Sequence, residues 1–210
     1  MSFVVKNTTF GPLDLLCPYN CLGCGCTGEL LCKRCKKYLC CKNDTKTLPK
    51  NTYAYGQRTG MLDMLIKEYK YGPVRGLAVI LAELLDEVVP RLPGKIVVVP
   101  LPTIKRHIRQ RGFDHMKLLA KKFARKRGWR YASLLNRINS TVQVGASERE
   151  RFLQAKNAYA TKGLVDQGCG YLLVDDVWTT GASMEAATLV LREAGAKKIY
   201  RAVLAVSERD

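Results

Sequence analysis

The stretch that decides the fold reads YLLVDDVWTTGASM and spans residues 171–184. Its first four residues form an apolar run, which predicts a short buried strand. An acidic pair, Asp175 and Asp176, comes next, and the small and hydroxylated segment Thr179–Ser183 leads into a region where apolar residues recur at helical spacing. The sequence therefore predicts a strand, an acidic turn, a small-residue loop and a helix, in that order.

This order of elements favours a site for a sugar phosphate, although similar patterns also occur in α/β proteins that bind no ligand there. A tight loop that enters a helix directs backbone N–H groups toward one point, where the helix dipole favours negative charge. Thr179, Thr180 and Ser183 add hydroxyl groups, and Gly181 and Ala182 are small enough for a ligand to approach. The preceding carboxylates suit sugar hydroxyls or a Mg²⁺ ion.

Composition and charge limit the classes of protein that this chain can represent. A length of 210 residues allows one medium domain and a small module, and 47% hydrophobic residues suffice for a core. We expect a cytoplasmic protein without a membrane span, because no secretory signal and no run of 18 apolar residues is visible. The net charge of +17 favours a polyanionic partner, such as nucleic acid or a diphosphate, but also fits plain solubility.

Cysteines are concentrated near the N-terminus, where residues 1–50 hold eight of the nine. The zinc prediction rests on two knuckles, Cys21-x2-Cys24 and Cys32-x2-Cys35, which are separated by seven residues. Four thiolates in two such pairs fit a closed tetrahedral Zn²⁺ site. The zinc is expected to be structural, because a module this small cannot bury much apolar surface. Disulfides are the weaker interpretation without a secretory signal.

The remaining cysteines of this segment are spaced less favourably for binding a metal ion. A second metal site, an exchange of ligands with the first site, and simple burial as small apolar residues all stay open. These residues are Cys17, Cys26, Cys40 and Cys41.

The rest of the chain alternates between helical and strand patterns. After a polar connection over 48–60, two apolar helices are expected, then a buried strand within 95–102 and a final strand over 199–206. This alternation predicts an α/β fold over 51–210, with a doubly wound, mostly parallel sheet. Ligands of such sheets bind at the carboxyl ends of the strands, where both Asp175–Ser183 and Pro100–Thr103 are expected.

A basic segment over 105–130 carries eleven basic residues and one acid. Lys117, Lys121 and Arg125 follow one face of its predicted helix, which serves either solvation or nucleic-acid binding. Arg109 and Arg111 precede that helix in a predicted loop, where charge more often serves binding.

A long polar segment over 133–159 follows the basic helix. Such a segment inside a compact domain is either disordered or functional. Its basic residues are Arg137, Arg149, Arg151 and Lys156.

The stretch VDDVWTTGAS, residues 174–183, resembles the motif by which type I phosphoribosyltransferases bind 5-phosphoribosyl-1-pyrophosphate (PRPP). The resemblance implies that Asp175 and Asp176 contact the ribose hydroxyls together with Mg²⁺. It also implies that Thr179–Ser183 bind the 5′-phosphate of PRPP or of another ribose phosphate.

The order of segments along nearly the whole chain is similar to that of the ComF family, competence-associated proteins with a zinc ribbon and a domain of type I phosphoribosyltransferase kind. The family typically has RGFNQ where this chain has RGFDH, Arg111–His115. The resemblance implies that Pro100, Leu101, Pro102 and Thr103 form the pyrophosphate loop. It also implies that the segment 137–156 is a hood over the substrate.

The sequence supports two hypotheses for the function, from different classes, and a third, weaker one. The first is a PRPP-binding, phosphoribosyltransferase-like protein of DNA uptake or nucleotide metabolism, in which pyrophosphate leaves an oxocarbenium-like centre. Its acceptor is not evident, and no residue stands out as a general base. The second is a non-catalytic protein that binds single-stranded DNA and works with DNA-uptake proteins. The third is a sensor that binds PRPP without turning it over.

Overall fold

The computed structural model describes residues 19–39, 48–72, 74–138 and 158–207, and the chain forms two compact units, Met1–Leu39 and Cys40–Asp210. Several residues singled out above lie outside the described residues: Cys17, Cys40, Cys41, Arg149, Arg151 and Lys156.

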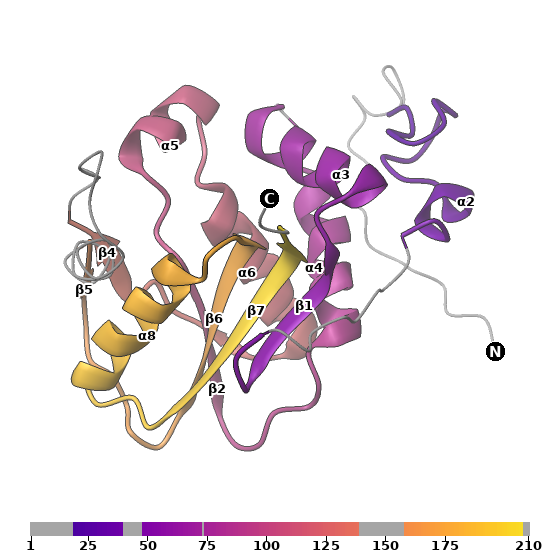
Figure 1. Cartoon of the computed structure of the whole chain (residues 1–210). Helices are drawn as coiled ribbons and strands as arrows, with labels where there is room; N and C mark the ends of the chain where they lie inside the picture. The colour runs from indigo at the N-terminus through magenta and orange to yellow at the C-terminus, as the bar shows by residue number, and fades with distance from the viewer. Residues whose placement is uncertain (1–18, 40–47, 73, 139–157, 208–210) are drawn as a thin grey trace. The chain divides into compact units, whose positions relative to one another are not determined.

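The larger unit is built on a five-stranded sheet in which all the paired strands are parallel (Figure 1). Across the sheet the strands are β1 (Thr52–Gln57), β7 (Lys198–Val206), β6 (Gly170–Trp178), β2 (Ile96–Pro100) and β3 (Arg130–Tyr131). A separate antiparallel pair consists of β4 (Leu135–Arg137) and β5 (Tyr159–Thr161).

Helices cover both faces of this sheet, as Figure 1 shows. Helices α4 (Leu77–Val88) and α6 (His115–Arg127) pack together on one face, and α8 (Ala182–Glu193) packs on the other. Among the described residues of this unit, the other helices are α3 (Gly60–Tyr71) and α5 (Lys105–Arg111). The predicted doubly wound, parallel architecture is confirmed.

The central strands are apolar on both sides because both of their faces are covered. All five residues of β2 are buried, and so are the first five of β6. Alternate residues such as Val97, Val99 and Leu173 belong to the same core cluster as Met184 and Leu191 of α8. The strand period of two assigns the intervening residues to the face of α4 and α6.

The position of the site follows from the strand order. Strands β2 and β6 are neighbours, but the chain leaves β2 toward β3 at one edge and leaves β6 toward β7 on the other side. The connections after the two strands therefore diverge and open a crevice at their carboxyl ends, where ligands of open α/β sheets bind.

Three local predictions were wrong. Strand β6 does not end before the acidic pair: it continues to Trp178, and Asp175 pairs with Val203 of β7. The predicted polar connection over 48–60 contains the edge strand β1, in which Tyr55 is buried. The predicted loop that carries Arg109 and Arg111 is helix α5. None of the residues of this helix is buried, so its sequence shows no apolar periodicity that would have predicted a helix.

The smaller unit holds a short helix, α2 (Lys33–Lys36), and an isolated bridge between Asn20 and Thr27. The Cys32 side chain caps this helix by accepting a hydrogen bond from the backbone N–H of Cys35. Among the helices described in both units, none combines the length and the apolar character that crossing a lipid bilayer requires.

Candidate functional site

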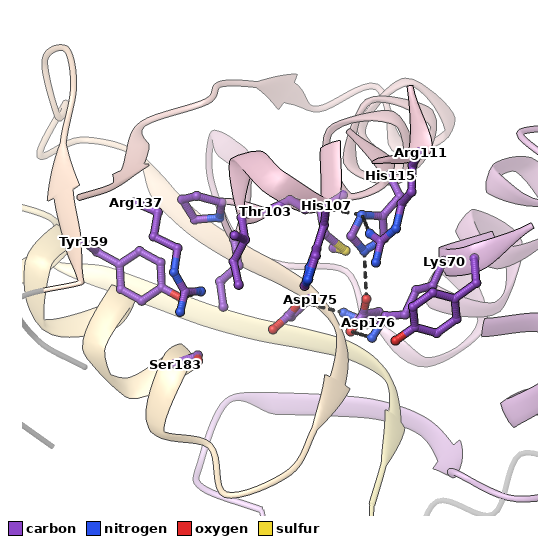
Figure 2. Close-up of a pocket in the computed structure, with 15 residues that line it drawn as sticks. Lys70, Thr103, His107, Arg111, His115, Arg137, Tyr159, Asp175, Asp176 and Ser183 are labelled. Carbon is purple, nitrogen blue, oxygen red and sulfur yellow. Dashed lines mark hydrogen bonds and ion pairs between the residues drawn. The ribbon is translucent and has the colours of Figure 1, made fainter. Parts of the chain in front are cut away.

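A pocket of about 210 Å³ opens at the carboxyl ends of β2 and β6 (Figure 2). It is lined by carboxylates of β6, by the loop after β2, and by cationic and aromatic side chains from α3, α5, α6, β4 and β5. Its polar and charged lining residues are Lys70, Tyr71, Thr103, His107, Arg111, His115, Arg137, Tyr159, Asp175, Asp176 and Ser183.

The two carboxylates of the acidic pair have different surroundings. Asp176 is only 6% exposed, and both of its oxygens are engaged. Lys70 Nζ lies 2.8 Å from Oδ1, and His115 Nε2 lies 2.9 Å from Oδ2. Burial by itself raises the pKa of Asp176, but the hydrogen bond from His115 and the charge of Lys70 outweigh it and lower the pKa to about 2. Asp176 is therefore ionised and held in place.

His115 connects Asp176 to Arg111. Arg111 Nη1 lies 2.9 Å from Nδ1 of His115, and a guanidinium group has only donors, so Nδ1 accepts. The proton of the neutral imidazole is then on Nε2, from which it is donated to Asp176. The hydroxyl group of Tyr69 donates to the backbone carbonyl of His115 at 2.6 Å, which fixes the start of α6.

Asp114 ties the loop after β2 to α6. Its Oδ1 accepts from the backbone N–H of Lys117 at 3.1 Å, as an N-cap, and from Thr103 Oγ1 at 3.0 Å. Asp114 and His115 are the residues at which this chain departs from the RGFNQ pattern, and both have defined structural partners.

Asp175 is the member of the pair that remains partly exposed to the pocket. Its Oδ1 accepts a hydrogen bond from the backbone N–H of Asp176 at 2.9 Å. Burial and the neighbouring charge of Asp176 raise the pKa of Asp175 to about 7. A cation that binds here stabilises the ionised form, so Asp175 is the carboxylate of this pair that is available to a ligand.

A second, smaller cavity of about 50 Å³ lies between Asp175 and the start of α8, and Thr179, Gly181 and Ser183 line it. Gly181 precedes α8 with φ of 79° and has no side chain that could cap the helix. Thr180 Oγ1 accepts from the N–H of Ala182 at 3.3 Å, and the described residues offer no other side-chain acceptor to the first turn. The first-turn N–H groups of α8 are thus suited to an anion.

Gly181 has a packing role that was not foreseen. A Cβ at this position would clash with the ring of Trp178. The contact that requires glycine here is therefore with this ring.

Arg137 and Tyr159 reach toward the start of α8 from the pair of strands β4 and β5 (Figure 2). Arg137 Nη1 donates to the hydroxyl oxygen of Tyr159 at 3.4 Å, and Ser183 at the start of α8 lines the same pocket. A cation and a phenol therefore stand beside the proposed phosphate loop.

The structure brings many, but not all, of the predicted site residues together. The residues lining either cavity are Leu101, Pro102, Thr103, Arg111, Arg137, Asp175, Asp176, Thr179, Gly181 and Ser183. Other predicted residues do not line these two cavities: Pro100, Arg109, Thr180 and Ala182.

Sequence reasoning missed Lys70, His107, His115 and Tyr159. Lys70 lies on a helix that was interpreted as core-forming, and the departure from RGFNQ is the feature of the sequence that could have identified His115.

The basic face of α6 is partly engaged within the chain. Lys117 Nζ lies 3.4 Å from Oδ2 of Asp114, and Lys121 Nζ lies 5.4 Å from the centre of the Tyr131 ring. Arg125 lies exposed in the last turn of the helix.

The cysteines of the smaller unit form a cluster that fits a metal ion. The Sγ atoms of Cys21, Cys24, Cys26 and Cys32 all lie within 4.8 Å of one another. Cys24 Sγ and Cys32 Sγ are 3.7 Å apart. Zn–S bonds of 2.3 Å in a tetrahedron place the sulfurs about 3.8 Å apart, so this thiol set suits Zn²⁺.

Three of the predicted zinc ligands belong to this group of four sulfurs, and Cys26 completes it. The fourth predicted ligand, Cys35, is buried, and its thiol interacts with those of Cys24, Cys32 and Cys21.

Comparison with known proteins supports the resemblance to the ComF family. The chain is 33% identical over 99 residues to the competence protein ComFC of Bacillus subtilis (strain 168). The match covers 47% of this chain and 39% of that protein, so the chain spans about two fifths of its relative's length. No family model matches the chain.

Several solved structures are similar at low identity. The allosteric regulatory enzyme of purine biosynthesis is 20% identical, with a TM-score of 0.47, over 66% of this chain and 30% of that one. Adenine phosphoribosyltransferase from Leishmania tarentolae is 11% identical, with a TM-score of 0.42, over 77% of this chain and 93% of that one.

Proposed function

We propose that the larger unit binds PRPP, or another ribose phosphate, together with Mg²⁺ in the pocket at the ends of β2 and β6. The observation that carries this proposal is an available carboxylate, Asp175, between a set of cationic side chains and the N-terminus of α8. A ribose ring that carries phosphates at both ends needs this combination of one acceptor group and two anion-binding regions.

The ribose and the metal are assigned to Asp175. Its carboxylate suits the ribose hydroxyls, which donate hydrogen bonds, and Mg²⁺, which prefers hard oxygen ligands. Mg²⁺ usually keeps several waters and takes one or two carboxylates, so one available carboxylate is sufficient. Asp176 contributes indirectly by holding Lys70 and His115 in place.

The two phosphate groups are assigned to opposite ends of the site. The 5′-phosphate is assigned to the small cavity beside Thr179 and Ser183, at the N-terminus of α8. The diphosphate is assigned to the larger pocket, whose cations Lys70 and Arg111 come from α3 and α5.

If the protein transfers the phosphoribosyl group, these cations and Mg²⁺ neutralise the pyrophosphate that leaves as the C1–O bond breaks. His115 is poorly placed as a general base, because Nδ1 already accepts from Arg111 and Nε2 donates to Asp176. We therefore propose a phosphoribosyltransferase-like, PRPP-binding protein. The name of its relative ComFC, a competence protein, supports a role in DNA uptake.

A thermal-shift experiment tests ligand binding. Both tryptophans, Trp129 and Trp178, lie in the larger unit, so their fluorescence follows the unfolding of that unit. PRPP with Mg²⁺ at a hundredfold excess over Kd should raise the melting temperature by roughly 5–10 °C. PRPP with EDTA should give a clearly smaller shift. An equal melting temperature with and without Mg²⁺ and PRPP would count against the proposal.

Single-stranded DNA is the alternative ligand, and the net charge of +17 favours it. The test is the salt dependence of DNA binding by wild-type protein and by the variant in which Lys117, Lys121 and Arg125 are all changed to Glu. Each lost phosphate contact should flatten the slope of log K against log salt by about 0.7. An unchanged slope would show that this face is only solvated.

A further inference from the structure

The cysteine cluster of the smaller unit contains more thiols than one zinc ion binds. A structural Zn²⁺ ion takes four ligands in a tetrahedron. Here four sulfurs lie within 4.8 Å of one another, and Cys35 interacts with three of them. Five thiols therefore converge on a site for four.

Cys26 and Cys35 are the two thiols that compete for one position. The thiols of both interact with those of Cys24 and Cys32. Cys35 also interacts with Cys21, yet it falls outside the group of four sulfurs that includes Cys26. In this structure Cys26 completes the set of four close sulfurs, and Cys35 is next to the set, with its backbone N–H on Cys32 Sγ at 3.5 Å.

The backbone around the cluster distinguishes fixed thiols from the exchanging ones. The backbone N–H of Cys32 donates to Cys21 Sγ at 3.3 Å, and that of Cys35 donates to Cys32 Sγ at 3.5 Å. Such N–H donors stabilise bound thiolates, which supports Cys21 and Cys32 as permanent ligands. Cys35 is 4% exposed and lies in α2. Cys26 is exposed and lies on a loop, and its backbone carbonyl accepts a hydrogen bond from the N–H of Cys21.

We propose that Cys21, Cys24 and Cys32 hold Zn²⁺ in every state and that Cys26 and Cys35 alternate as the fourth ligand. When one replaces the other, the incoming thiol releases a proton and the departing thiolate takes one up, so the charge of the centre does not change. The zinc module then keeps its metal when either of the two alternating thiols is removed or blocked. This proposal rests on zinc binding by the cluster and is independent of PRPP.

The test measures zinc retention in the full chain and in four variants: Cys26→Ser, Cys35→Ser, the double variant of both, and Cys32→Ser. Zinc per chain is measured by native mass spectrometry, and the affinity by competition with a chromophoric chelator. Each of the first two variants should retain one zinc ion with an affinity within about tenfold of wild type. The double variant should bind roughly a hundredfold more weakly or worse, because one of four ligands is lost without a substitute.

Cys32→Ser is the matched control, because it removes one thiol and leaves four. It should lose affinity as strongly as the double variant, since Cys26 and Cys35 do not occupy the site together. The proposal is overturned if Cys26→Ser or Cys35→Ser alone loses as much as the double variant. A zinc affinity within about tenfold of wild type in the double variant or in Cys32→Ser, or absence of zinc from wild type, also overturns it.

A second readout does not depend on affinity. Co²⁺ in place of zinc gives absorption bands that distinguish four thiolates from three. Cys26→Ser and Cys35→Ser should both keep the four-thiolate spectrum, and the double variant should lose it. A three-thiolate spectrum in either single variant would identify the missing residue as a permanent ligand.

Discussion

Replacing Lys70 by Met tests whether Asp176 is held by its neighbours or free to bind a ligand. Lys70 Nζ lies 2.8 Å from Asp176 Oδ1, and the side chains are 19% and 9% exposed. Met retains most of the length of the lysine side chain and removes its charge. One oxygen of a mostly buried carboxylate then has no cation beside it, while His115 still donates to the other.

The expected loss of stability can be worked out from these contacts. Removing one partner of a buried ion pair costs about 3–5 kcal/mol, and the remaining hydrogen bond from His115 reduces this to roughly 2–3 kcal/mol. The pKa of Asp176 leads to a similar figure. It falls from its ordinary value of 3.8 to about 2, a difference of about 1.8. At about 1.4 kcal/mol for each unit, this corresponds to about 2.5 kcal/mol for His115 and Lys70 together, after the opposing effect of burial.

The sign of the pH dependence follows from the lowered pKa. Because the folded state holds Asp176 ionised, this stabilisation is fully present above the unfolded value of 3.8 and is lost as pH falls toward about 2. Lys70→Met raises the folded pKa of Asp176, so its free energy of unfolding should change less between pH 4 and pH 2 than that of wild type.

The assay is urea unfolding followed by tryptophan fluorescence, at several pH values. Lys67→Met is the matched control on the same helix, because Lys67 Nζ lies 2.7 Å from Asp63 but its side chain is 56% exposed. An exposed pair contributes less than about 1 kcal/mol. Equal losses in the two variants, or an unchanged pH dependence in Lys70→Met, would refute the reasoning and leave Asp176 available to a ligand.

Three further predictions concern the same site. His115→Ala should lower both the stability and the affinity for Mg²⁺ and PRPP. In His115→Gln the PRPP affinity measured by calorimetry should stay within about threefold of wild type, because the glutamine amide can still donate to Asp176. Gly181→Ala should cost about 1–3 kcal/mol in urea unfolding, because φ is 79° and the added Cβ meets Trp178. PRPP binding should strengthen as pH rises through about 7, since the raised pKa of Asp175 keeps it protonated below that pH, and Asp175→Asn should flatten this dependence.

The sequence predicted the sheet well because its central strands are continuous apolar runs, such as the residues of β2 and the start of β6. It placed the end of β6 too early, because two adjacent carboxylates do not suit a strand interior. The groups that neutralise Asp176 come from α3 and α6, so the local pattern carries no sign of them.

Strand β1 was missed for a related reason. It lies at the edge of the sheet, and its stability comes from pairing with β7 at the other end of the chain, as between Thr52 and Arg201. Short polar segments of this kind look like connections until their partner is known.

The candidate site was predictable where one segment carries it and not where the fold assembles it. The stretch 174–183 predicted both carboxylates and the small-residue loop. Lys70, by contrast, reaches Asp176 from a distant helix, and no spacing rule connects the two. The same pattern treated Asp175 and Asp176 as equivalent, and only the packing around them separates an available carboxylate from an engaged one.

The most direct test of PRPP binding is isothermal titration calorimetry of PRPP into the zinc-loaded protein with Mg²⁺, at pH 8, where Asp175 is ionised. We predict saturable binding of one PRPP per chain, weakened about ten- to a hundredfold in Asp175→Asn, because a hydrogen bond to a charged group is worth about 1.5–3 kcal/mol. The absence of heat with millimolar PRPP and Mg²⁺, or equal binding by wild type and Asp175→Asn, would contradict the account.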